Sequence, residues 1–151
     1  MTNSPSGNPC GRILLVDDNS MGLAARRSVL EELGHKVMTS GNAQEALELC
    51  GKQTFDVVVT DYKMPKMDGI ELIERLRKQH SSVGVILISG FSDTLGLNEA
   101  NTGADIVIQK SSNEVSHLIR SVHRLLRKKQ QPAKKPAGSQ LAAKPDRRKS
   151  R

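Results

Sequence analysis

The stretch FDVVVTDYKMPKMDG, residues 55–69, decides the fold of this chain. Its first five residues are apolar apart from one Asp, too few for a helix and rich in β-branched side chains, which is typical of a strand buried on both faces of a parallel sheet. The run stops at Asp61, and after Gly69 the apolar residues recur at helical spacing. Asp61 is therefore expected where a buried strand meets its loop, the edge at which open α/β sheets bind ligands. A carboxylate in that position needs a charged partner, a metal or a reaction.

The same alternation of short apolar runs and helical patterns recurs along the chain. We expect strands over residues 13–16, 35–39, 55–59, 83–88 and 106–108. We expect helices over residues 20–33, 43–50, 68–80, 92–101 and 113–129. Asn19 or Ser20 can cap the first helix and Asn42 the second, while Gly34 and Gly51 are expected to end them. Five strand–helix pairs joined by right-handed crossovers predict a doubly wound α/β fold, a five-stranded parallel sheet with helices on both faces.

The composition predicts one domain with an aliphatic core. Hydrophobic residues make up 36 % of the 151 residues and aromatic residues only 2 %. The sequence shows neither a membrane-spanning run nor a signal peptide. Cys10 and Cys50 match no metal or redox spacing, which favours free thiols in the reducing cytoplasm. Four histidines also lack metal-binding spacing and are predicted to lie on the surface: His35, His80, His117 and His123.

The basic charge of the chain is concentrated at its C-terminal end. Residues 127–151 contain ten Lys or Arg and one Asp, so the remaining residues carry a net charge of −2 out of a total of +7. We expect a flexible leader over residues 1–11, a domain over residues 12–129 and a disordered basic tail over residues 130–151. The tail suits a solubilising extension, or weak salt-dependent contact with nucleic acid or acidic partners, because it has no aromatic residues to read bases.

Polar side chains follow four of the five expected strands, and together they suit the transfer of a phosphoryl group to a carboxylate. Asp17 and Asp18 follow the first strand, and Asp61 follows the third. Clustered carboxylates repel one another, and a hard cation such as Mg²⁺ relieves the repulsion and neutralises an incoming phosphoryl group. Lys110 can supply a positive charge and Ser89 a hydroxyl group to the phosphoryl oxygens. Asp61 is then the candidate nucleophile.

These motifs resemble the receiver domains of two-component response regulators. The resemblance rests on LLVDDN at residues 14–19, DYKMPKMDG at 61–69, ILISG at 86–90, GAD at 103–105, and Lys110. It covers residues 12–129, with the motifs in the family's order and spacing. The family has the strand order 2-1-3-4-5, and the resemblance implies that order here.

The resemblance also implies a role for each acidic residue. Asp61 resembles the phosphoacceptor, and Asp18 the direct Mg²⁺ ligand. Asp17 would bind the ion through water, and the backbone carbonyl of Lys63 would be a further ligand. Mg²⁺ is thus the implied cofactor. The implied phosphoryl donor is a histidine kinase or a histidine phosphotransfer protein.

Ser89 and Lys110 are expected, by the same resemblance, to contact the phosphoryl oxygens, but two positions near them depart from the family pattern. The family usually has a cis proline after the lysine, whereas Ser111 follows here. A cis bond without proline costs about 3 kcal/mol, so a cis bond is not expected. The family often has an aromatic ring where this chain has Val107, so transmission of the switch must differ.

The favoured function is a stand-alone receiver in two-component signalling, with no enzymatic activity beyond self-catalysed phosphoryl transfer and dephosphorylation. Only residues 130–151 follow the last expected helix, which leaves no room for an effector domain. One alternative is a pseudo-receiver, a scaffold that binds partners without phosphorylation. A second is a phosphohydrolase that forms an aspartyl phosphate. Such enzymes need a second acid two residues after the first-strand aspartate, where this chain has Asn19 or Ser20.

Overall fold

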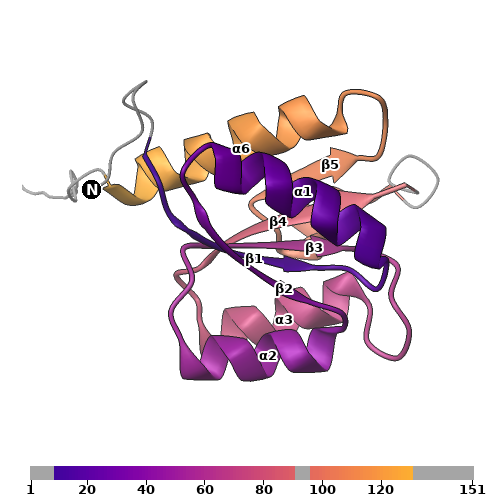
Figure 1. Cartoon of the computed structure of the whole chain (residues 1–151). Helices are drawn as coiled ribbons and strands as arrows, with labels where there is room; N and C mark the ends of the chain where they lie inside the picture. The colour runs from indigo at the N-terminus through magenta and orange to yellow at the C-terminus, as the bar shows by residue number, and fades with distance from the viewer. Residues whose placement is uncertain (1–8, 91–95, 131–151) are drawn as a thin grey trace, which may run out of the picture.

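The computed structural model describes residues 9–90 and 96–130 (Figure 1). The predictions for the leader before residue 9, for residues 92–95 and for the tail after residue 130 lie outside these residues. The described residues form a five-stranded parallel sheet in the order β2-β1-β3-β4-β5, which confirms the predicted topology. The strands are β1 (Arg12–Val16), β2 (Lys36–Ser40), β3 (Val57–Asp61), β4 (Gly84–Ser89) and β5 (Ile106–Gln109).

Helices cover both faces of the sheet. Their bounds are α1 (Ser20–Glu32), α2 (Ala43–Lys52), α3 (Gly69–Gln79), α5 (Glu99–Thr102) and α6 (Glu114–Gln130). Helices α1 and α6 lie on one face, and α2 and α3 lie on the other (Figure 1). Successive residues of each strand point to opposite faces, so the core is divided into two aliphatic clusters. Leu15 and Ile88 pack in the cluster under α1 and α6, whereas Leu14 and Leu87 pack in the cluster under α2 and α3. None of the described helices combines the length and the apolar character needed to cross a membrane.

Three helices begin directly after loops at the carboxyl edge of the sheet, and a side-chain cap fixes each start. Asn19 accepts hydrogen bonds from the backbone N–H groups of the first turn of α1. Asn42 caps α2 and Asp68 caps α3 in the same way, each through the third N–H of its helix. Such caps contribute about 1 kcal/mol each and fix where the strand-end loop must stop. Asn19, rather than Ser20, is therefore the cap of the first helix.

Three details of the predicted elements are wrong. Gly51 does not end its helix but lies inside α2, because a glycine near a helix end weakens the helix without stopping it. The described part of the predicted helix over 92–101 is helical only over Glu99–Thr102, after Gly96 with φ of +66°. Val115, expected on the buried face of α6, is 44 % exposed. It lies in the first turn, and helical periodicity does not show where the sheet beneath a helix ends.

His35 is buried, which corrects its predicted place on the surface. Its side chain lies just before β2 with 4 % of its area exposed, and its ring centroid is 5.6 Å from that of His123. The backbone N–H of Gly11 donates to Nδ1 at 3.1 Å, so the neutral ring carries its proton on Nε2. Nε2 is buried and has no hydrogen-bond partner among the described residues. Burial, and secondarily the neighbouring His123, lower the pKa of His35.

This environment predicts that the protein loses stability in mild acid. Because the pKa of His35 is lower in the folded than in the unfolded chain, the unfolded chain binds the proton more readily. The free energy of unfolding should therefore fall as the pH drops below about 6.5, the unfolded value. His35→Asn keeps an acceptor near Gly11 and cannot titrate, so urea unfolding of this variant between pH 8 and 5 should show a smaller decline. His117→Asn, at an exposed position, should decline like the unchanged protein; equal slopes for all three would contradict the assignment.

Gly69 brings the first turn of α3 against the end of β3, so a matched pair of glycine substitutions tests this packing. A Cβ on Gly69 would lie 2.5 Å from the backbone oxygen of Asp61 and 2.9 Å from Leu87 Cδ1. Gly69→Ala should lower the free energy of unfolding by about 2 kcal/mol, as overpacking does. A Cβ on Gly51 meets no atom within 4 Å, so Gly51→Ala should raise it by about 0.5 kcal/mol. Chemical denaturation measures both changes, and a neutral Gly69→Ala would contradict the close packing.

Candidate functional site

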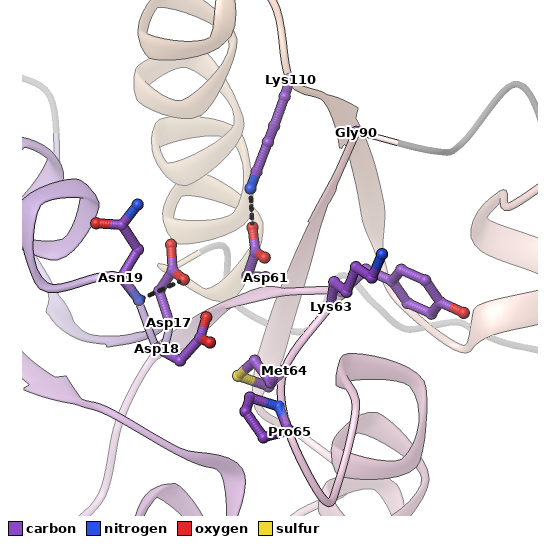
Figure 2. A pocket seen from close by; sticks show the side chains of 10 residues that line it. Asp17, Asp18, Asn19, Asp61, Lys63, Met64, Pro65, Gly90 and Lys110 are labelled. Atoms are coloured by element: carbon purple, nitrogen blue, oxygen red, sulfur yellow. Dashed lines mark hydrogen bonds and ion pairs between the residues drawn. The ribbon is translucent and has the colours of Figure 1, made fainter.

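A pocket of about 680 Å³ opens at the carboxyl edge of the sheet, where β1 and β3 end (Figure 2). Its lining residues are Asp17, Asp18, Asn19, Asp61, Tyr62, Lys63, Met64, Pro65, Gly90 and Lys110. Five of the six residues singled out from the sequence are among them. The pocket thus brings together side chains that are up to 93 positions apart, because parallel strands in this order end side by side.

Asp61 and Lys110 form an ion pair at the centre of the pocket (Figure 2). Lys110 Nζ lies 2.8 Å from Asp61 Oδ1. The Asp61 side chain is only 4 % exposed, because it ends the fully buried strand β3, whereas the Lys110 side chain is 43 % exposed. No donor among the described residues makes a hydrogen bond of good geometry to Oδ1, so the contact is chiefly electrostatic. The buried oxygen is thus paired with a side chain that is itself partly exposed at the pocket mouth.

The pKa of Asp61 is raised, and burial is the main cause. Loss of water disfavours the ionised carboxylate, and the nearby negative charge of Asp17 adds to the effect. Lys110 lowers the pKa of Asp61 through its close polar contact with the carboxylate and through its positive charge, and the charge of Arg26 adds a smaller effect in the same direction. Asp61 is therefore a more basic carboxylate than one in water, which suits a nucleophile.

Asp17 is also buried, and both of its carboxylate oxygens are in use. Oδ1 accepts a hydrogen bond from the backbone N–H of Asn19 at 3.0 Å, and Oδ2 pairs with Arg26 at 3.0 Å. The same Arg26 side chain reaches Glu114 Oε2 through two nitrogens, each at 2.9 Å. Arg26 was not predicted from the sequence. The feature that could have identified it is an arginine at a position where α1 faces the core, between the buried Leu23 and Leu30.

The loop between β3 and α3 forms one wall of the pocket. Met64 is buried and anchors the loop to the core beneath α2 and α3. Lys66 has φ of +71°, and the N–H of Met67 donates to the carbonyl of Pro65 at 2.8 Å, which together make a tight three-residue turn. The side chain of Lys63 extends away from Asp61 (Figure 2), and the role of its backbone carbonyl as a metal ligand stays a prediction.

Ser89 is the predicted site residue that does not line the pocket. It is the last residue of β4 and is 1 % exposed, while the next residue, Gly90, reaches the pocket wall. The carbonyl of Ser89 accepts a hydrogen bond from the backbone N–H of Lys110 at 3.0 Å, which fixes the two residues beside each other. The bond from Lys110 to Ser111 is trans, as expected for a residue other than proline.

The donor atoms of the pocket suit a hard cation that prefers oxygen. Asp61 offers a buried carboxylate oxygen without a well-directed hydrogen bond, and Asp18 makes no ion pair with any described residue. In the described part of the chain, no three acidic, His or Cys side chains are grouped so as to hold a metal ion. Asp17 is engaged by Arg26, so the direct carboxylate ligands would be Asp18 and Asp61. With a backbone carbonyl and water they make an oxygen set that fits Mg²⁺.

Comparison with known families agrees with the geometry of the pocket. The sequence pattern of the response regulator receiver domain family matches residues 13–123. The chain belongs to this family. A gliding motility regulatory protein of Myxococcus xanthus is 31 % identical over 117 residues, which are 76 % of this chain and 15 % of that protein. A probable histidine kinase of rice is 38 % identical over 74 residues, 49 % of this chain and 8 % of that protein. This receiver therefore corresponds to a small part of both relatives.

Solved receiver structures share the fold at similar identity. The receiver domain of Francisella response regulator 1452 has a TM-score of 0.72 and 30 % identity, covering 80 % of this chain and 99 % of that one. Response regulator TrrA of Thermotoga maritima, solved in complex with Mg²⁺ and BeF, has a TM-score of 0.69 and 30 % identity. That match covers 76 % of this chain and 98 % of TrrA.

The raised pKa of Asp61 predicts that the ionised carboxylate lowers the free energy of unfolding of this receiver. Asp61→Asn removes the buried charge while keeping the shape, so it should raise the free energy of unfolding at pH 8 by about 1 kcal/mol. The gain should shrink as the pH falls through the folded pKa, because protonated Asp61 is also neutral. Urea unfolding at several pH values measures it. Glu74→Gln, on the exposed face of α3, should have no such effect, and a destabilised Asp61→Asn at pH 8 would contradict the prediction.

Proposed function

We propose that this receiver accepts a phosphoryl group on Asp61 from a histidine kinase or a histidine phosphotransfer protein, in a transfer that depends on Mg²⁺. The observation that carries the proposal is the buried Asp61 carboxylate paired with Lys110 in an acidic pocket. The pocket brings together a candidate nucleophile, a partly exposed positive charge and carboxylate oxygens that could hold a metal ion. Family membership supports the same chemistry.

The transfer exchanges one bond to phosphorus for another. An Asp61 carboxylate oxygen forms a bond to phosphorus while the phosphorus–nitrogen bond of a phosphohistidine breaks. The electron pair of that bond stays on the imidazole nitrogen, which then takes a proton. Lys110 leaves the bare carboxylate and pairs with a phosphoryl oxygen, because its exposed side chain can follow the charge. A hydroxyl contact from Ser89 to the same oxygens stays a prediction from the sequence, since Ser89 does not line the pocket.

The acidic residues would hold the cofactor from one side of the pocket. Asp18, Asp61 and the backbone carbonyl of Lys63 would bind Mg²⁺ directly, and Asp17 would bind it through water. When bound, the ion neutralises part of the negative charge that gathers as the phosphoryl group meets the carboxylates. Asp17 lies in the pocket with Arg26 fixing one of its oxygens, which suits an indirect role.

We further propose that the protein works as a switch in the cytoplasm and not as an enzyme with a separate substrate. Its only chemistry would be the gain and hydrolysis of its own aspartyl phosphate. The described helices include none that could span a membrane. The stand-alone character predicted from the sequence stays a prediction.

Mass spectrometry tests the phosphoryl transfer. Incubated with a small acyl phosphate donor and Mg²⁺, the full chain should gain the mass of one phosphoryl group, and removal of Mg²⁺ with a chelator should abolish most of the gain. Asp61→Asn should show no gain, and Lys110→Met should show a gain at least ten-fold slower. Glu74→Gln is the matched control and should react normally.

Two outcomes would replace the proposal. A mass gain that persists in Asp61→Asn would exclude Asp61 as the acceptor. A protein that never gains mass, from the small donor or from a phosphorylated phosphotransfer protein, would be a scaffold of the pseudo-receiver kind. Steady hydrolysis of a small phosphate ester would instead indicate a phosphohydrolase.

A further inference from the structure

Arg26 forms a buried bridge between the acidic pocket and helix α6. Its side chain is 8 % exposed and contacts Asp17 Oδ2 at 3.0 Å and Glu114 Oε2 at 2.9 Å. Asp17 follows β1, and Glu114 is the first residue of α6. The three residues come from three separate parts of the chain, up to 97 positions apart, so only the folded structure brings their charges together.

The bridge is a specific arrangement. Arg26 occupies a position between Leu23 and Leu30 where the helix otherwise buries apolar side chains. A guanidinium in such a place is stable only if its charge is compensated, and two carboxylates provide this here. The planar guanidinium also holds both carboxylates in a fixed relation, which a lysine cannot reproduce.

We propose that Arg26 is a positioning residue that couples cation binding in the pocket to the first turn of α6. The inference rests on the proposed function, since the cation is the Mg²⁺ of that site. Asp17 can attract the hydrated cation only to the extent that it releases Arg26, because its other oxygen is bound to the Asn19 N–H. Arg26 then turns to its second partner, Glu114. Cation binding thus strengthens the contact that fixes the start of α6.

Linkage requires the coupling to work in both directions. If the cation strengthens the contact of Arg26 with Glu114, a strong contact with Glu114 must favour the cation by the same factor. Loss of Glu114 leaves Arg26 to Asp17 alone and should weaken cation binding. Loss of Arg26 frees Asp17 and should strengthen cation binding. A side chain that only stabilised the fold would not give opposite signs.

Calorimetric titration of the full chain with MgCl₂ tests the coupling. Arg26→Met should bind Mg²⁺ about five-fold more tightly than the unchanged protein, and Glu114→Gln about five-fold more weakly, within the usual range of coupling between sites. Arg26→Met with Glu114→Gln should bind like Arg26→Met alone, because Glu114 acts only through Arg26. This double variant also removes the partly buried carboxylate of Glu114, which Arg26→Met alone would leave without its arginine, so it remains informative if Arg26→Met folds poorly.

The exposed pair on the same helix provides matched controls. Arg27 and Glu31 lie 3.0 Å apart with side chains that are 49 % and 44 % exposed, and neither contacts the pocket. Arg27→Met and Glu31→Gln make the same changes in net charge, and each should leave the Mg²⁺ affinity within two-fold of the unchanged protein. Arg26→Lys keeps the charge but loses the two-sided contact, so its Mg²⁺ affinity should lie between that of the unchanged protein and that of Arg26→Met.

A second readout follows α6 directly. On addition of Mg²⁺, the backbone amide signals of residues 114–118 should shift in the unchanged protein and stay in place in Arg26→Met, while those of residues 17–19 shift in both. Equal Mg²⁺ affinities in Arg26→Met and Arg27→Met, or unchanged α6 signals in the unchanged protein, would overturn the inference alone. No Mg²⁺ binding by any of the proteins would overturn the metal site of the proposed function as well.

Discussion

The carboxylate of Asp61 is almost removed from water, and an ion in that position persists only where other charges compensate it. Lys110 supplies the nearer positive charge from the loop after β5, and Arg26 supplies a second from α1. The neighbouring Asp17 works against both. The pocket is therefore a balance of close opposite charges, and an arriving cation or phosphoryl group must displace contacts that already exist. The contacts in such a site should change when a charged group binds, because the negative charges of Asp61 and Asp17 are only partly compensated by Lys110 and Arg26.

The sheet makes this balance possible by geometry alone. All five strands run parallel, so the residues that end them gather at one edge, and the caps on α1, α2 and α3 keep the loops there short. Gly69 allows α3 to begin against the backbone of Asp61, and Lys66 adopts a left-handed backbone to complete the loop. A left-handed backbone at a residue other than glycine persists only where the surrounding packing fixes it, and here it lies in the loop that leads away from Asp61.

The convergence of Asp17, Asp18, Asp61 and Lys110 could be predicted from the sequence because each lies within two residues of the end of an apolar run with the pattern of a strand. In a parallel sheet the carboxyl ends of the strands lie at one edge. Locating the strands from the spacing of apolar residues was therefore sufficient to predict that these side chains lie close together. The bridge of Arg26 could not be predicted, since its partner Glu114 lies 88 positions away on another helix. Burial of His35 and exposure of Val115 depend on where two helices meet the sheet. The pattern of a single segment does not contain that information.

These two kinds of contact would have separate roles in the proposed switch, with the strand-end residues responding to charge. On β5, the strand that precedes Lys110, Val107 donates its backbone N–H to Glu99 at 2.9 Å, and its partly buried side chain packs against the core beneath α2 and α3. Arg26, by contrast, contacts two carboxylates at once, so a change in the charge near one of them alters its contact with the other. A contact that joins the pocket at one end to the start of α6 at the other would be the route by which a change of charge in the pocket, as proposed, reaches the surface of this close-packed fold.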